Sequence, residues 1–155
     1  MKKIILLCFA FVAIVSACRK THVSNDICDC ANSQSTFYIG SDTLIVPNLF
    51  TPNGDGQNDE WFITNLDKFP GIKIKVSRPG LLGGSVYDYT SDNPYWNGDK
   101  GKNSLYKEGK YKYEITVNGQ TLTGYVCIYR GKVNIDNHDC LKSCTVTNQN
   151  DPVIN

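Results

Sequence analysis

Cysteine is the residue type of this chain with the clearest chemistry, because thiols form disulfides, bind metal ions and act as nucleophiles. Two of the seven, Cys8 and Cys18, lie near the N-terminus, and the other five are Cys28, Cys30, Cys127, Cys140 and Cys144. A zinc site made from these thiols and His138 would favour the C-x2-C spacing, but one pair is separated by one residue and another by three. We therefore expect disulfides, no firm metal site, and one thiol that is left free or intermolecular.

The spacing of the five cysteines also limits how they can pair. Cys28 and Cys30 are too close for an easy mutual bridge, so each should find a partner distant in sequence. A bridge from either one to Cys140 or Cys144 would close a loop of about 100 residues, which the chain-entropy model values at about 4.7 kcal/mol. A Cys140–Cys144 bridge would stabilise less. We expect at least one long-range bridge, with Cys127 as a second partner or as the odd thiol.

A second chemical candidate is the segment Asn53-Gly54-Asp55-Gly56-Gln57-Asn58-Asp59, which places hard oxygen donors at alternate positions of a flexible loop. Calcium prefers such oxygens, so Asn53, Asp55, Asn58 and Asp59 form a candidate calcium loop. The loop is not an EF-hand, because its sixth position is Asn58 rather than Gly. The same residue types build ordinary β-turns, and we favour that interpretation. No cofactor other than calcium is expected.

The N-terminus predicts export. Lys2 and Lys3 precede an uncharged apolar run over residues 4–15, which is too short to cross a bilayer as a helix. The ending Val15-Ser16-Ala17-Cys18 is similar to a bacterial lipobox. We therefore predict a signal peptide over residues 1–17, and lipidation of Cys18 by a diacylglyceryl group with chains such as palmitate. Two acyl chains are enough for stable anchoring, so the membrane is the first expected partner. The expected location is the cell envelope, as an outer-membrane lipoprotein that faces the periplasm or the surface.

Composition excludes several classes of protein. Without residues 1–17 the chain has 14 Lys and Arg against 15 Asp and Glu, a formal charge of −1, which gives no reason to expect nucleic-acid binding. There is no G-x-S-x-G or H-E-x-x-H motif, and the two histidines, His22 and His138, lie in predicted tails. We therefore expect a protein that is not an enzyme.

The sequence predicts β-strands in the middle of the chain. Residues 72–76 and 111–117 alternate apolar and polar side chains, and Asn118-Gly119 is a strong signal for a two-residue hairpin turn. Such a hairpin opposes Val117 to Gln120, and opposed residues share a face. One face then carries the core residues Tyr111, Tyr113, Ile115, Val117, Leu122, Val126 and Ile128. The other face carries Lys112, Glu114, Thr116, Thr121, Thr123, Tyr125, Cys127 and Tyr129, unless a bulge at Gly124 reverses the assignment of Cys127.

Several motifs in order resemble the gliding motility-associated C-terminal domain, the type B sorting domain of the type IX secretion system. They are Val46–Asp59 as the opening signature, Ile74–Arg78, Val86-Tyr87, Tyr95-Trp96-Asn97-Gly98, Gly109–Tyr113 and Gly124–Arg130. The resemblance covers about residues 44–130. One departure is Arg78-Pro79-Gly80, where members typically have Arg-Trp-Gly. A second is the lipobox where a long passenger would stand, which favours a function of the domain itself.

We therefore predict an all-β, immunoglobulin-like sandwich of about seven short strands with disulfide-tied tails. The expected layout is a lipidated Cys18 with a polar tether over 18–43, the sandwich over 44–131, and a Cys-containing polar tail over 132–155. Five aromatic residues are assigned to the core rather than to a ligand platform: Trp61, Tyr87, Tyr89, Tyr95 and Trp96. The leading functional hypothesis is a non-enzymatic envelope lipoprotein in surface attachment or assembly, with secretion-machinery or envelope proteins as partners. The alternative is a calcium- or glycan-binding adhesin-like module, and a small hydrolase or its inhibitor is the weakest.

Overall fold

The protein is described from a computed structural model, in which residues 27–79, 83–90, 95–102, 104–132, 135 and 138–154 are placed. Nine strands account for most of the regular structure of these residues: β1 (Thr36–Ile39), β2 (Asp42–Ile45), β3 (Leu49–Phe50), β4 (Lys73–Ser77), β5 (Ser85–Asp88), β6 (Asp99–Gly101), β7 (Ser104–Leu105), β8 (Gly109–Val117) and β9 (Gln120–Ile128). Short helical segments complete it: residues 27–29, η1 (Cys30–Asn32), η2 (Leu66–Lys68) and α3 (Asp139–Lys142).

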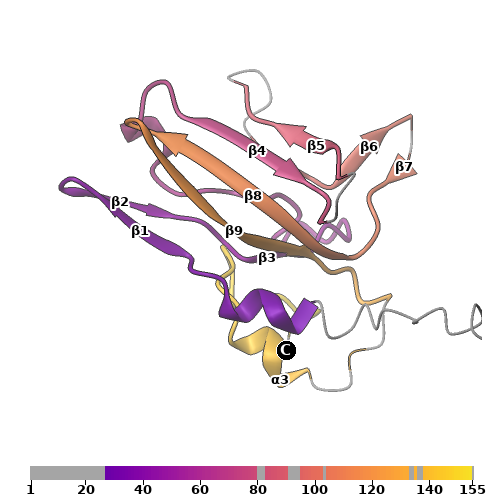
Figure 1. Ribbon diagram of the computed structural model, residues 1–155. Coiled ribbons are helices and arrows are strands. Elements are labelled where there is room, and N and C mark those ends of the chain that lie inside the picture. The colour runs from indigo at the N-terminus through magenta and orange to yellow at the C-terminus, as the bar shows by residue number, and fades with distance from the viewer. Residues whose placement is uncertain are drawn as a thin grey trace, which may run out of the picture.

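One five-stranded sheet organises the molecule, in the order β3-β9-β8-β4-β5 (Figure 1). All its neighbours are antiparallel except β3, which runs parallel to β9. The β1–β2 and β6–β7 hairpins form two further small sheets. The prediction of an all-β, sandwich-like fold is confirmed, and the described strands number nine rather than about seven.

The β8–β9 hairpin has the predicted register. Val117 opposes Gln120 across the Asn118-Gly119 turn, and the pairing continues without a shift to Gly109 and Ile128. Both turn residues have positive φ, 48° and 76°, as a two-residue turn of this kind requires. No bulge interrupts β9 at Gly124, so Cys127 lies on the face opposite the main core, as predicted. Gly124 is needed for another reason, because a Cβ there would collide with the ring of Tyr113.

The main core lies between the inner face of the five-stranded sheet and the β1–β2 hairpin with the loop that follows β3. Phe37 and Leu44 of the hairpin, Trp61 of the loop, and Tyr113 and Ile115 of β8 are all buried in this one cluster. Trp61 and Trp96 form an isolated antiparallel bridge, and their rings meet edge to face with centroids 6.2 Å apart. Burial of this apolar surface is the main source of stability for the fold.

A second, smaller core covers the opposite face of the sheet where β3 and β9 pair. It includes Ile27, Cys127, Tyr129, Leu141 and Ile154. The N-terminal residues 27–35 and the segment 138–154 therefore lie together against the same end of the sheet, as Figure 1 shows for η1 and α3.

The two segments predicted as a tether and a polar tail are therefore more structured than their composition indicated. β1 and the first two residues of β2 lie inside the range 18–43, and Phe37 and Ile39 belong to the main core. Leu141 and Ile154 of the range 132–155 are 0% and 1% exposed. The reason is that a few buried apolar side chains in each segment, such as Phe37 and Ile39 of β1 and Leu141 and Ile154, are enough to attach it to the body.

Candidate functional site

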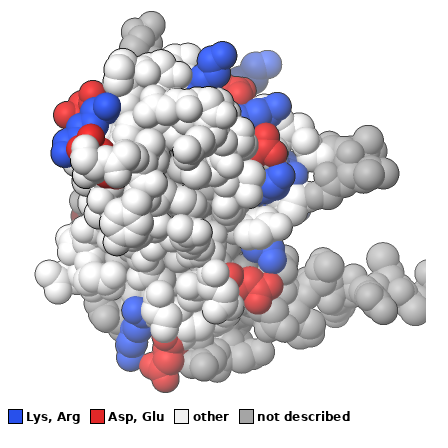
Figure 2. All heavy atoms as spheres, turned by 60° about the vertical axis from the view of Figure 1, so that its left-hand side comes forward, with Lys and Arg blue, Asp and Glu red and all other residues white. Residues whose placement is uncertain are grey.

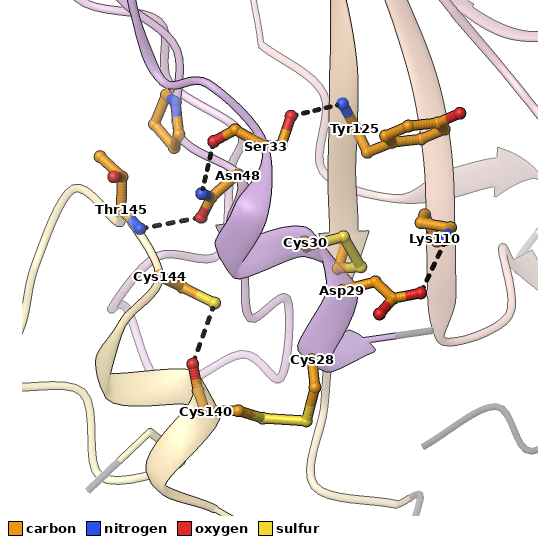
Figure 3. The surroundings of a disulfide bond; sticks show 12 residues. Cys28, Asp29, Cys30, Ser33, Asn48, Lys110, Tyr125, Cys140, Cys144 and Thr145 are labelled. Carbon is orange, nitrogen blue, oxygen red and sulfur yellow. Dashed lines mark hydrogen bonds and ion pairs between the residues drawn. A yellow bond between two sulfur atoms is a disulfide. The ribbon is translucent and has the colours of Figure 1, made fainter. Parts of the chain in front are cut away.

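Two disulfides join the terminal segments to each other and to the sheet (Figure 3). Cys28 bonds Cys140 with a Cα–Cα distance of 5.3 Å across 112 residues, and Cys30 bonds Cys127 with a distance of 6.1 Å across 97 residues. The long-range bridge that we expected is present, and Cys127 is the second partner rather than the odd thiol. These distances lie in the range typical of disulfides.

Cys144 is the odd thiol among the described cysteines. Its Sγ lies 3.6 Å from the carbonyl oxygen of Cys140 (Figure 3), and burial raises the pKa of the thiol to about 11. The thiolate is the reactive form of cysteine, so burial disfavours reaction of this thiol at neutral pH. Because the other four thiols are bonded in pairs, the zinc arrangement weighed for these residues is not formed, and His138 packs instead against the ring of Tyr129.

The candidate calcium loop is closed by hydrogen bonds of its own. The Asp59 carboxylate accepts the backbone N–H groups of Asn53, Gly54 and Gly56 at 2.7–2.9 Å. Asp55 accepts the N–H of Gln57 at 2.8 Å and the side-chain amide of Asn53 at 2.9 Å. These are the contacts of the turn interpretation. Among the described residues, no group of three or more His, Cys, Asp or Glu side chains is placed to hold a metal ion.

Asn58 is oriented differently from the other three loop residues. It is 8% exposed and has a φ of 47°, which asparagine accepts more readily than most residues. Its side-chain amide donates to the carbonyl oxygen of Asn148 at 2.7 Å and to the carboxylate of Asp151 at 2.9 Å. Its side-chain oxygen accepts the N–H of Asn148 at 2.7 Å. The signature residues 46–59 are therefore held against the segment 138–154, about 90 residues later in the chain.

Two further signature residues contact the same segment. The hydroxyl of Thr51 bonds the fully buried carboxylate of Asp151. Asn48, itself 1% exposed, donates its backbone N–H to the carbonyl oxygen of Thr145 at 3.0 Å, and its side-chain oxygen accepts the N–H of Thr145 at 2.8 Å (Figure 3). None of these residues, Asn48, Thr51, Asn148 and Asp151, was a site candidate on sequence grounds. Asn48 and Thr51 lie within the recognised signature, whereas nothing in the local pattern marks Asn148 or Asp151.

Arg130 and Gly98, from two of the ordered motifs, form one structural unit. The guanidinium of Arg130 donates to the carbonyl oxygens of Pro52 at 2.8 Å and Tyr106 at 2.9 Å. Gly98 has a φ of 73°, and a Cβ added there would lie 2.8 Å from Nη2 of Arg130. Burial lowers the pKa of Arg130, and the nearby Glu108 opposes this shift. The arginine at the end of the module thus holds the signature segment and the loop before β8 together.

Most of the aromatic residues lie in the core, as predicted. Trp61, Trp96 and Tyr87 are at most 6% exposed, and Tyr89 packs against the same cluster. Tyr95 differs, because it is 39% exposed and its ring lies 5.5 Å from that of Phe62.

The predicted lipidation site, Cys18, lies outside the described residues, as do the signal peptide and His22. In the part of the chain that is placed, no helix has the length and apolar character needed to cross a membrane.

The fold and its bridges define a small, disulfide-bonded, all-β module with a long polar signature segment. This chain belongs to the CHU_C type IX secretion signal domain family, whose model matches residues 44–128. The match confirms the resemblance noted from the motifs. It indicates a type IX secretion-associated protein of the cell envelope or of the secreted fraction. No curated protein and no solved structure gave a significant match.

Proposed function

We propose that this protein is a non-enzymatic cell-envelope lipoprotein, anchored through Cys18, whose type IX secretion-associated domain acts in surface attachment or assembly. The family match over residues 44–128 carries the proposal, because it associates the body of the chain with type IX secretion. The two disulfides support it, since such bonds persist in oxidising compartments outside the cytoplasm.

The position of the predicted anchor also supports the proposal. Cys18 precedes the first bridged cysteine, Cys28, by ten residues. An extended chain of that length spans at most about 35 Å. A lipid on Cys18 would therefore hold the β-module close to the bilayer.

The surface chemistry agrees with a role in protein contacts rather than in nucleic-acid binding or catalysis. On the face shown in Figure 2, basic and acidic side chains lie near one another around a broad uncharged area, with no extended patch of one sign. Asp55 and Asp59 accept backbone N–H groups, and His138 packs against Tyr129, so these groups have structural roles that explain their presence.

The anchor is tested by the Cys18→Ala variant of the full chain, produced in a bacterium that processes lipoproteins. We expect the wild-type protein in the membrane fraction after a salt wash, and the variant in the soluble envelope or culture fraction. Cys144→Ala is the matched control, because it also removes one thiol but leaves the anchor in place. A Cys18→Ala protein that stays in the washed membrane would contradict the lipoprotein proposal.

The link to secretion is tested by protease treatment of intact cells with and without a working type IX system. The domain should be cleaved at the surface only where the system works. Equal cleavage in both strains would leave the anchor standing and overturn the secretion-dependent part of the proposal.

A further inference from the structure

We infer that Asn48, Thr51, Gln57 and Asn58 form a peptide-binding site on the module, and that residues 145–151 are its intramolecular ligand. The four residues belong to the region matched by the family model, whereas the ligand segment lies beyond it. The site therefore lies within the family module, and the segment that occupies it lies outside the module.

The first contact is a pair of hydrogen bonds to the main chain at Thr145. The backbone N–H of Asn48 donates to the carbonyl oxygen of Thr145, and the Asn48 side-chain oxygen accepts the Thr145 N–H. The side-chain amide of Asn48 also donates to the carbonyl oxygen of Ser33 at 3.3 Å, which fixes its orientation. Asn48 therefore satisfies both polar groups of one residue in the ligand, as a neighbouring strand would.

The second contact is made with the main chain three residues later, at Asn148. The Asn58 side chain donates to its carbonyl oxygen and accepts its N–H, both at 2.7 Å. A side-chain amide has the same donor and acceptor as a peptide group, so it can replace a paired strand. The Asn148 side chain adds one bond, from its amide to the side-chain oxygen of Gln57 at 2.9 Å.

The third contact is made with the carboxylate of Asp151. Asp151 is 0% exposed, and one of its oxygens bonds both the Thr51 hydroxyl and the Asn58 amide. Its other oxygen accepts the N–H of Val153 at 2.8 Å, which turns the chain away from the site. A charge at this depth is stable only where donors surround it, so this contact selects for an acidic residue.

The chemistry of the partner follows from these three contacts. The site accepts a peptide through its main chain at two positions three residues apart, and it selects a carboxylate three residues further on. In this chain the ligand is covalently held, because Cys140 is bonded to Cys28 only five residues before Thr145. A tethered ligand has an effective concentration in the millimolar range, so it excludes other peptides of moderate affinity.

The test uses a fluorescent synthetic peptide of residues 145–154 and the full-length protein. In an open variant, Asn148→Pro removes one N–H from the attached ligand and Asp151→Ala removes its carboxylate. We expect the peptide to bind the open variant and to show at least tenfold weaker binding to the wild-type protein, as measured by fluorescence anisotropy.

Matched changes test the individual contacts. On the open variant, Asn58→Asp keeps the size and the positive φ but places a charge opposite the incoming carboxylate, so peptide binding should fall at least tenfold. An Asp151→Ala peptide should also lose at least tenfold. An Asn150→Ala peptide should bind as the parent does, because that side chain is exposed.

An open variant that melts cooperatively but binds no peptide overturns the inference, as does equal binding by the Asn58→Asp protein. If the open variant does not fold, Asp151→Asn replaces it as a milder change of the same contact. Peptide binding to the Asp151→Asn protein should be weaker than that expected for the open variant but still measurable. Absence of binding to a folded Asp151→Asn protein would also overturn the inference. The outcome does not depend on lipidation or on secretion, so it is separate from the proposed function.

Discussion

Gly98 shows how a side chain distant in the sequence, that of Arg130, can require glycine at one position. Both Gly98 and Gly101 have positive φ, 73° and 81°, so an alanine at either position is strained. They differ in their surroundings, because a Cβ at Gly98 would meet Arg130, while a Cβ at Gly101 would meet nothing within 4 Å. Arg130 is held by two carbonyl oxygens and has little freedom to move aside.

We therefore predict that Gly98→Ala costs about 1–3 kcal/mol more in unfolding free energy than Gly101→Ala, as overpacking of a filled site does. Denaturant unfolding of both variants measures the difference directly. Equal costs would mean that only the backbone strain matters and that the Arg130 contact is adaptable.

Asp59 allows the two interpretations of the signature loop to be separated. Since its carboxylate accepts three backbone N–H groups, Asp59→Ala should lower the unfolding free energy by about 1–3 kcal/mol whether or not calcium is present. Glu60→Ala, an exposed neighbour, should change it little. Thermal melts with and without calcium make the comparison. A calcium-dependent rise in Tm of the wild-type protein, lost in Asp55→Ala, would instead establish a calcium site.

At the scale of elements, the two disulfides are nested and therefore not equivalent. Once Cys30–Cys127 is closed, the Cys28–Cys140 bridge constrains only the residues by which the two separations differ, 112 against 97, a loop of 15. The chain-entropy model gives about 3 kcal/mol for a loop of that size, less than for the long loop alone.

We predict that the paired change Cys28→Ser and Cys140→Ser lowers the unfolding free energy by about 3 kcal/mol and leaves the Cys30–Cys127 bridge intact. Denaturant unfolding measures the loss, and non-reducing peptide mapping checks the remaining bridge. Cys144→Ala is the control, which keeps both bridges and removes only a buried thiol. A loss no larger than that of the control, or a map with different pairs, would contradict the arrangement.

At the scale of the whole molecule, the bridged end and the hairpin tip lie far apart. β9 runs from Thr121 near the tip to Cys127 at the bridge to Cys30, which is about 20 Å of extended strand. The chain that leads from a lipidated Cys18 would join the module at Cys28. The bridged end would therefore lie nearer the bilayer than the hairpin tip.

This orientation predicts a difference between two labelled positions in lipidated protein on vesicles. A fluorophore on Lys142→Cys, next to the bridged Cys140, should be quenched by brominated lipid more strongly than one on Thr121→Cys. The unlipidated Cys18→Ala protein is the control for non-specific quenching. Equal quenching at both sites would show that the module has no preferred orientation on the membrane.

What could be inferred from the sequence was local. The register of β8 and β9, the face occupied by Cys127 and the family of the domain follow from alternation, an Asn-Gly turn and ordered motifs, each contained in a short stretch of chain. Only the tertiary structure decided that Cys28 pairs with Cys140, that residues 36–45 form a hairpin, and that Asn58 and Asp151 meet. These contacts join residues as much as 112 positions apart, and main-chain hydrogen bonds to Thr145 and Asn148 require no particular side chain. A contact that reads the backbone leaves no pattern in the sequence of its partner, so it became visible only when the chain was folded.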